Sequence, residues 1–231
     1  MKSKRNDFIQ AKLLVDGEIT AEEYALPFGL SVATAAVQLK NFAIANPNLS
    51  QRVVGENKWV KPTLKGKAKP KYDISVKDAE FLLEAVEDLV DCLNPDVEVT
   101  RETLRFAYAE AKLIENKKLG RDDIARAFEL AGAAATRTMQ AYNAQVPGNV
   151  ELEDRRYHVM TKDFKPMFLV KREAAEIMIS AMEDIVGEDA LYSSDRKLWH
   201  KERNRTPRPK RAAAAKGLKV TKGIRKPVVA R

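Results

Sequence analysis

The stretch LAGAAATRTMQAYNAQVPGNVELEDRRYHVMTKDFKPMFL, residues 130–169, decides the fold that we expect for this chain. Its first part predicts a helix of small residues that ends at an aromatic residue and a Pro-Gly-Asn turn. A polar hairpin with paired arginines and an apolar segment follow. One hundred positions upstream, residues 30–63 read LSVATAAVQLKNFAIANPNLSQRVVGENKWVKPT and keep the same order of parts. The two stretches indicate an internal duplication.

A second pair of matching segments follows these two stretches. Residues 79–90 read AEFLLEAVEDLV, and residues 175–186, 96 positions later, read AEIMISAMEDIV. Identities alternate with like-for-like apolar replacements along the whole segment. We therefore infer two tandem copies of one structural unit, followed by a tail that has no counterpart.

Local signals in the first copy predict three helices and a hairpin. An apolar face indicates a helix over residues 7–15, and Thr20 with Glu23 forms a capping-box pattern for a short second helix. Ser31 is the expected N-cap of a third helix that runs to about residue 45, and residues 49–61 predict a β-hairpin. This order is typical of a winged helix-turn-helix unit, in which the hairpin is the wing.

An amphipathic helix with an acidic outer face follows each predicted winged unit. Its carboxylates would repel phosphate, so we expect it to pack against other helices. The expected fold is mainly α with small β-hairpin wings. Its segments are a first winged helix (1–64), a basic linker (65–74), a packing helix (75–94), a second winged helix (99–169), a second packing helix (170–189) and a disordered basic tail (190–231).

The net charge of +8 is unevenly distributed along the chain. Residues 190–231 hold 14 Lys or Arg against 2 Asp or Glu, and residues 1–72 hold 12 against 6. Residues 73–189 hold 15 against 25, so an acidic middle separates two basic segments. This segregation favours a polyanionic partner, contacted at two places, over a merely solvated surface.

Several other function classes find no support in the sequence. The single cysteine, Cys92, rules out an internal disulfide and indicates a reducing compartment. No apolar run reaches membrane length, so we expect a cytoplasmic, nucleoid-associated protein. No phosphate loop, nucleophile motif or zinc-ligand set occurs, so we expect no enzyme, cofactor or metal site. Trp59 and Tyr157 stand at matched hairpin positions, which favours packing against the third helix over stacking on bases.

The second copy carries a further set of residues in and around its hairpin: Tyr142, Pro147-Gly148-Asn149, Arg156-Tyr157, Thr161, Phe164, Pro166 and Phe168-Leu169. With them, it resembles the amino-terminal winged-helix domain of bacterial WYL-type transcription factors, the BrxR/CapW group of defence-system repressors. The first copy keeps a smaller part of the pattern: Leu30-Ser31, Ala35, Leu39, Phe42 and Lys58-Trp59-Val60. The resemblance implies binding to double-stranded DNA. Nothing in the chain resembles the family's ligand-sensing WYL domain, so regulation by a ligand is not implied.

In a winged helix the third helix enters the major groove and the wing contacts the flanking backbone. In the first copy we expect base contacts from Ser31, Thr34 and Gln38, because Gln can pair bidentately with adenine. The expected phosphate contacts of this copy are Lys40, Arg52, Lys58 and Lys61. The second copy, whose alternative is a solvated surface, would use Arg137, Thr138, Arg155, Arg156 and Lys162. Sequence-independent affinity would come from tail residues Arg205, Arg208, Lys210 and Arg211.

The apolar stripes of the two packing helices are a candidate dimer contact, formed by Leu82, Val86, Leu89, Met178, Met182 and Ile185. Packing on each other would make one chain an intramolecular pseudo-dimer, suited to an imperfect inverted repeat with half-sites about 34–36 Å apart or a multiple of that. The alternative is that each stripe covers its own domain and a homodimer uses another surface.

We therefore expect a sequence-specific DNA-binding regulator, a repressor of bacterial or phage origin. One alternative is a plasmid-type replication initiator, which resembles this chain in having two winged helices. Another is a structural scaffold for chromosome segregation or DNA packaging, in which the second copy binds protein and the tail coats DNA.

Overall fold

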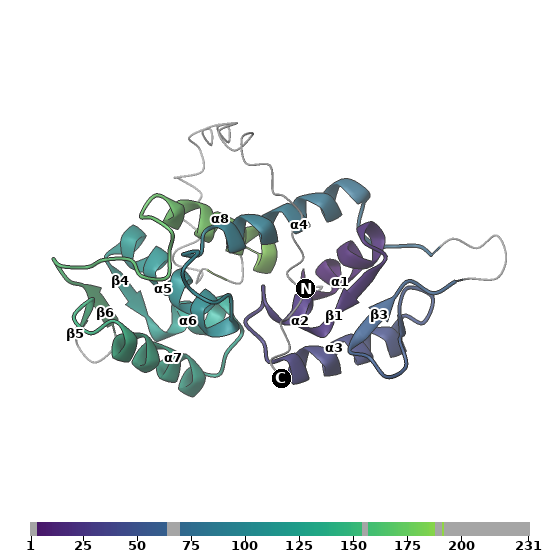
Figure 1. The fold of residues 1–231 in the computed structure, drawn as a ribbon, viewed down its shortest axis with the longest axis horizontal. Coiled ribbons are helices and arrows are strands. Elements are labelled where there is room, and N and C mark those ends of the chain that lie inside the picture. Colours follow the sequence, from purple (N-terminus) through teal and green to yellow (C-terminus); the bar gives the residue numbers. More distant parts are fainter. Residues whose placement is uncertain (1–3, 64–69, 154–156, 188–190, 192–231) are drawn as a thin grey trace, which may run out of the picture. The chain divides into compact units, whose positions relative to one another are not determined.

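The structure is a computed structural model that describes residues 4–63, 70–153, 157–187 and 191 (Figure 1). These residues are mainly helical, with eight helices and two small three-stranded antiparallel sheets. Residues 1–193 form one compact unit. Residues 65–69 of the predicted linker and, apart from Leu191, the predicted tail lie outside the described residues.

The first half of the unit begins with a helix and a short strand and ends with a long helix. Its elements are α1 (Lys4–Val15), β1 (Glu18–Thr20), α2 (Ala21–Ala25), α3 (Val32–Ala45), β2 (Gln51–Arg52), β3 (Lys58–Val60) and α4 (Val76–Asp91). The three strands form an antiparallel sheet in the order β1-β3-β2.

The second half repeats this order element for element. It consists of α5 (Arg101–Asn116), β4 (Lys118–Gly120), α6 (Arg121–Ala127), α7 (Gly132–Gln145), β5 (Val150–Glu153), β6 (Tyr157–Met160) and α8 (Ala174–Val186). Its sheet has the corresponding order β4-β6-β5. We refer to residues 4–91 as copy one and to residues 101–186 as copy two.

The helix starts follow the capping signals of the sequence. Thr20 and Glu23 form the predicted capping box of α2, with the Glu23 N–H 3.1 Å from Thr20 Oγ1 and the Thr20 N–H 2.8 Å from Glu23 Oε2. The hydroxyls of Ser31 and Ser75 accept backbone N–H groups at the starts of α3 and α4. Because each cap satisfies a donor that the helix itself leaves open, it fixes where the helix begins.

Two strands, β1 and β4, are absent from the sequence-based expectation, which has only turns at these places. Each has three residues, too few to show an alternating apolar pattern, and each is fixed by pairing with the hairpin. In the register of the two sheets, Ile19 is opposite Trp59, and Leu119 is opposite His158.

This register corrects the expected match between Trp59 and Tyr157. Trp59 is 1% exposed, whereas the Tyr157 ring is 37% exposed and lies 4.9 Å from the Lys118 ammonium. The structural counterpart of Trp59 is His158, whose pKa is lowered by burial. Among the hairpin residues that the structure describes, only Trp59 of the first hairpin places a large aromatic ring in the core.

The two packing helices lie against each other as well as against their own copies. α4 contacts α1 and α8, and α8 contacts α5. Leu82, Leu89, Met178, Met182 and Ile185 are buried, and Val86 is partly buried against the core. α4 and α8 lie side by side (Figure 1). Their apolar stripes thus form one continuous core that joins the two copies.

Candidate nucleic-acid interface

Helices α3 and α7 each bury one side and expose the other. In α3 the buried residues are Ala35, Leu39 and Phe42, and in α7 they include Ala135, Met139 and Tyr142. The exposed side of α3 includes Val37, Lys40, Asn41 and Ile44, and that of α7 includes Thr136, Arg137, Gln140 and Ala144. We call these two surfaces the outer faces of α3 and α7.

The predicted base-contacting residues of copy one divide between the helix start and the inner side of α3. Ser31 Oγ caps the helix and lies 2.8 Å from Thr34 Oγ1, so both hydroxyls are engaged with each other while Thr34 remains exposed. Gln38 is half-buried, and its Oε1 accepts the Tyr24 hydroxyl at 2.7 Å. The expectation that Gln38 faces outward is corrected by this inward hydrogen bond.

The predicted basic residues of copy one differ in what they already contact. Lys40 is exposed on the outer face of α3, and Lys61 is exposed with its ammonium 5.8 Å from the Tyr72 ring centre. Exposed Arg52 donates from Nε to the Glu56 carbonyl at 3.2 Å across the hairpin turn. Lys58 Nζ is 2.7 Å from Glu18 Oε2. A phosphate would therefore compete with a carboxylate for Lys58 but not for Lys40.

The predicted DNA-contacting residues of copy two include exposed residues, one buried residue and several that lie outside the described residues. Arg137 on α7 and Lys162 after β6 are exposed. Thr138 is only 7% exposed, and its hydroxyl donates to the Ala134 carbonyl at 3.1 Å. This corrects the expectation that Thr138 lies on the outer face. The remaining predicted residues lie outside the described residues: Arg155, Arg156, Arg205, Arg208, Lys210 and Arg211.

A buried carboxylate holds the segment that follows the second hairpin. Glu110 on α5 accepts backbone N–H groups from Met167, Phe168 and Leu169 at 2.8, 2.9 and 3.0 Å. Burial raises the pKa of this carboxyl, and the three N–H groups and the Tyr142 hydroxyl oppose the rise. Its role was not predicted, because a Glu within a helix gives no sequence signal for a distant loop.

Copy one has a weaker version of the same arrangement. Gln10 stands one hundred positions before Glu110, and its Oε1 accepts the Asp73 N–H at 2.7 Å. In both copies the first helix thus binds the backbone that leads from the hairpin to the packing helix. In each copy this contact fixes the segment between the hairpin and the packing helix against the first helix, α1 or α5.

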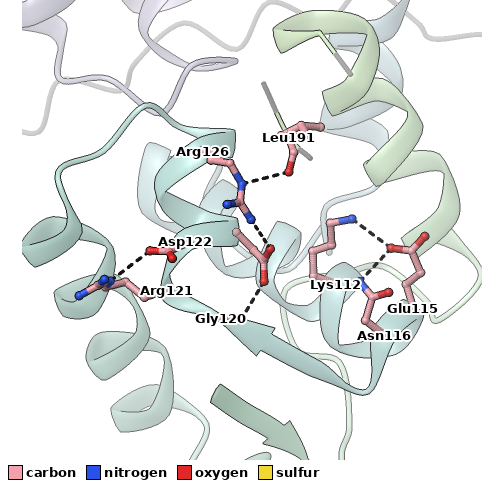
Figure 2. Close-up of polar contacts among 9 residues, drawn as sticks. Lys112, Glu115, Asn116, Gly120, Arg121, Asp122, Arg126 and Leu191 are labelled. Atoms are coloured by element: carbon pink, nitrogen blue, oxygen red, sulfur yellow. Dashed lines mark hydrogen bonds and ion pairs between the residues drawn. The ribbon is translucent and has the colours of Figure 1, made fainter. Parts of the chain in front are cut away.

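Polar contacts around α6 fix the approach to α7. Asp123 accepts the Gly120 N–H at 2.8 Å and the Arg126 guanidinium at 2.9 Å. Figure 2 shows Arg126 extending to the Leu191 carbonyl as well, at 3.1 Å from Nε. Leu191, which is buried, is therefore part of the folded unit even though it falls within the predicted tail.

The two copies contact each other reciprocally at the loops that precede α3 and α7. Arg5 of copy one forms an ion pair with Glu129 of copy two at 3.0 Å. Arg105 of copy two, one hundred positions after Arg5, donates to the Gly29 carbonyl of copy one. Gly29 and Glu129 are themselves equivalent, and both have left-handed backbones with φ of 58° and 49°. Arg5 of copy one thus contacts Glu129 of copy two, and the equivalent Arg105 of copy two contacts Gly29 of copy one. This exchange of equivalent contacts is the signature of a twofold relation.

Comparison with known proteins identifies no relative of this chain: no protein-family model, curated protein or solved structure matches it. Among the described residues, no helix combines the length and apolar composition needed to span a membrane. Within the same residues, no group of three or more His, Cys, Asp or Glu could hold a metal ion.

Proposed function

We propose that the chain is a sequence-specific regulator that binds double-stranded DNA through two winged helix-turn-helix units. The observation that carries this proposal is the twice-repeated order of helix, strand, helix, helix and two-stranded hairpin. In such a unit the third helix lies in the major groove and the hairpin lies over the adjacent backbone. A bacterial or phage repressor, similar to the WYL-type regulators in its winged units, is the form of this function that we favour.

The outer faces of α3 and α7 support the proposal by their composition and length. Each helix has 14 residues and is therefore about 21 Å long, enough to lie along the major groove. Neither outer face carries an acidic side chain, and Lys40 and Arg137 are positively charged. Acidic residues are instead concentrated on α4, where Glu80, Glu84, Glu87, Asp88 and Asp91 would be kept away from phosphate.

The contact between the copies supports a fixed spacing of the two units. α3 and α7 each begin three residues after the reciprocal contact at Gly29 and Glu129, and the packed α4 and α8 join the copies elsewhere. One chain would then act as an intramolecular pseudo-dimer on two half-sites. A twofold relation between the copies corresponds to inverted half-sites, as in a symmetric repressor dimer.

The direct test is selection of bound duplexes from a randomised double-stranded library by the purified chain. We expect a motif with two separate half-sites, and Arg137→Ala should reduce affinity for the selected duplex at least tenfold, as for loss of one good base contact. Glu80→Gln, an exposed change on α4, is the matched control and should leave affinity unchanged. Failure of the library to enrich any motif would contradict the proposal.

The basic tail is proposed to add affinity without reading sequence. A variant lacking residues 194–231 keeps Leu191 and its contact with Arg126, so the folded unit stays complete. We expect this variant to protect the same base pairs in a footprint but to bind with a smaller dependence on salt. A scaffold that only coats DNA with its tail would instead lose binding altogether.

The scaffold function is the second candidate, and one observation favours it. Val37 and Ile44 on the outer face of α3 are 57% and 70% exposed, and exposed apolar side chains also occur at protein–protein contacts. In that case Val37→Ala and Ile44→Ala would leave duplex binding intact. The selection experiment above separates the two functions, because a scaffold would give no enriched motif.

A further inference from the structure

Given the proposed DNA-binding function, we infer that the target is an inverted repeat whose halves differ in chemistry. The half under α3 is distinguished by readout of thymine methyl groups, in addition to hydrogen bonds. The half under α7 is read through hydrogen bonds to a guanine and an adenine. The argument depends on comparing side chains at equivalent positions of the two outer faces.

Equivalence of the two helices follows from their shared contacts. Residues 35, 39 and 42 are buried in α3, and residues 135, 139 and 142 are buried in α7. The Leu30 N–H bonds to the Ala25 carbonyl and the Leu130 N–H to the Ala125 carbonyl, at 2.9 and 2.8 Å. The offset between α3 and α7 is therefore one hundred positions throughout, and residues at that offset occupy the same place on their helices.

Three equivalent positions on the outer faces carry different chemistry. Val37 corresponds to Arg137, Lys40 to Gln140 and Ile44 to Ala144. All six side chains belong to exposed residues. Lys40 and the neighbouring exposed Asn41 give the α3 face an ammonium and an amide, and the α7 face offers a guanidinium and an amide. The faces differ in that only the α3 face exposes branched apolar side chains, those of Val37 and Ile44.

These side chains match different base edges in the major groove. Arg pairs bidentately with guanine and Gln with adenine, whereas an apolar side chain fits the thymine methyl group. Val37 and Ile44 lie seven residues apart, two helical turns, so they point to the same side and lie about 10.5 Å apart along the helix axis. That distance spans about three base pairs, so the α3 half-site should contain two thymines so separated.

The orientation of the half-sites follows from the reciprocal contact. Arg5 contacts the loop at Glu129, and Arg105 contacts the loop at Gly29. A head-to-tail arrangement of the copies would give only one of these two contacts, since equivalent residues would then face different surfaces. The half-sites are therefore inverted in direction while differing in base composition.

The experiment uses the full chain and the duplex that it enriches from the randomised library. We expect Arg137→Ala to lose preference at the guanine of one half only, and Val37→Ala to lose preference at a thymine of the other half only. Replacing that thymine by deoxyuracil removes one methyl group and should weaken wild-type binding about fourfold. The same replacement should have no effect on Val37→Ala.

A conversion variant gives a gain of function that misfolding cannot imitate. The quadruple change Val37→Arg, Lys40→Gln, Asn41→Ala and Ile44→Ala gives α3 the residues that α7 has at the equivalent positions, and it alters only exposed residues of α3. Its selected site should become a symmetric inverted repeat with guanine in both halves. Unchanged half-sites in this variant would overturn the inference.

The inference and the proposed function fail in different ways. A wild-type motif made of two identical half-sites, or of half-sites in the same direction, overturns the inference but leaves a sequence-specific DNA-binding protein. No enriched motif at all removes the proposed function. Enrichment of unlike, inverted half-sites that respond separately to Arg137→Ala and Val37→Ala supports both.

Discussion

Arg5 and Arg105 hold equivalent positions in the two copies, and each guanidinium lies near a phenylalanine of its own copy while contacting the other copy. Arg5 is 5.3 Å from the Phe28 ring centre and pairs with Glu129. Arg105 is 5.8 Å from the Phe128 ring centre and donates to the Gly29 carbonyl. The two arginines thus join the copies at the point from which both third helices start.

The first prediction concerns Arg105→Ala. Burial lowers the pKa of Arg105, and its charged hydrogen bond to Gly29 offsets part of that cost. We expect the variant to lower the free energy of unfolding by about 2 kcal/mol, measured by urea denaturation. Arg121→Ala, which removes an exposed pair with Asp122, is the control and should change it by less than about 0.5 kcal/mol. Equal effects of the two changes would show that the contact between copies adds no stability.

A second prediction concerns the close approach of Gly29 to copy two. A Cβ at this position would lie 2.8 Å from Phe128 Cδ1, and the backbone φ is +58°. Gly17 has a φ of +82° but nothing within 4 Å of such a Cβ. Gly17→Ala should therefore cost about 1 kcal/mol from the backbone alone, and Gly29→Ala about 2–4 kcal/mol, measured by thermal or urea unfolding. Equal costs would mean that the copies separate easily at this point.

Glu110→Gln is predicted to loosen the segment after the second hairpin. Glu110 Oε1 accepts the Met167 N–H, and Oε2 accepts those of Phe168 and Leu169, so an amide leaves at least one donor facing another donor. We expect a loss of about 1–3 kcal/mol in urea unfolding at neutral pH. Glu176→Gln, on the exposed side of α8, is the control. A loss no larger than that of the control would contradict the structural role of Glu110.

The same carboxyl predicts a pH dependence of stability. The pKa of Glu110 is raised above the ordinary value of 4.5, so the folded state binds this proton more tightly than the unfolded state. The stability gained from binding this proton is fully present below about pH 4.5 and is lost as the pH rises through the folded pKa, whereas the hydrogen bonds to Met167, Phe168 and Leu169 remain. The difference in unfolding free energy between wild type and Glu110→Gln should change over that interval. A constant difference across the interval would contradict the raised pKa.

Cys92 should be unreactive in the folded chain. Burial raises the pKa of its thiol to about 12, and the thiol donates to the Ala174 carbonyl at 3.5 Å. Because the thiolate is the reactive form, iodoacetamide at pH 8 should label native protein far more slowly than protein in concentrated urea. Equal rates would mean that the junction between α4 and α8 opens readily.

The sequence predicted those parts of the fold that are encoded locally or by repetition. Thr20 and Ser31 marked helix starts correctly, because a cap acts on the backbone two or three residues away. Ala35, Leu39 and Phe42 form the inner side of α3, because residues spaced i, i+4 and i+7 share one face of a helix. Strands β1 and β4 were missed because their partners are distant in the chain.

The candidate site was predicted less well than the fold. Gln38 and Thr138 are equivalent residues, one position before the buried Leu39 and Met139, and both turn inward. Where neighbouring elements cover more of a helix than its apolar stripe, the positions beside the stripe are buried as well. Their exposure depends on tertiary packing and not on the local sequence pattern. The reciprocal contact through Arg5 and Arg105 joins residues about 75–125 positions apart and gives no local pattern at all.

The joining of the two copies by α4 and α8 within one polypeptide has a consequence for dilute solution. A symmetric dimer of separate chains dissociates when its concentration falls below the dissociation constant, whereas two covalently connected copies keep a high effective concentration of each other. The paired unit therefore persists at a few molecules per cell. Each copy can also acquire substitutions that its twin does not share, a freedom that two products of a single gene never have.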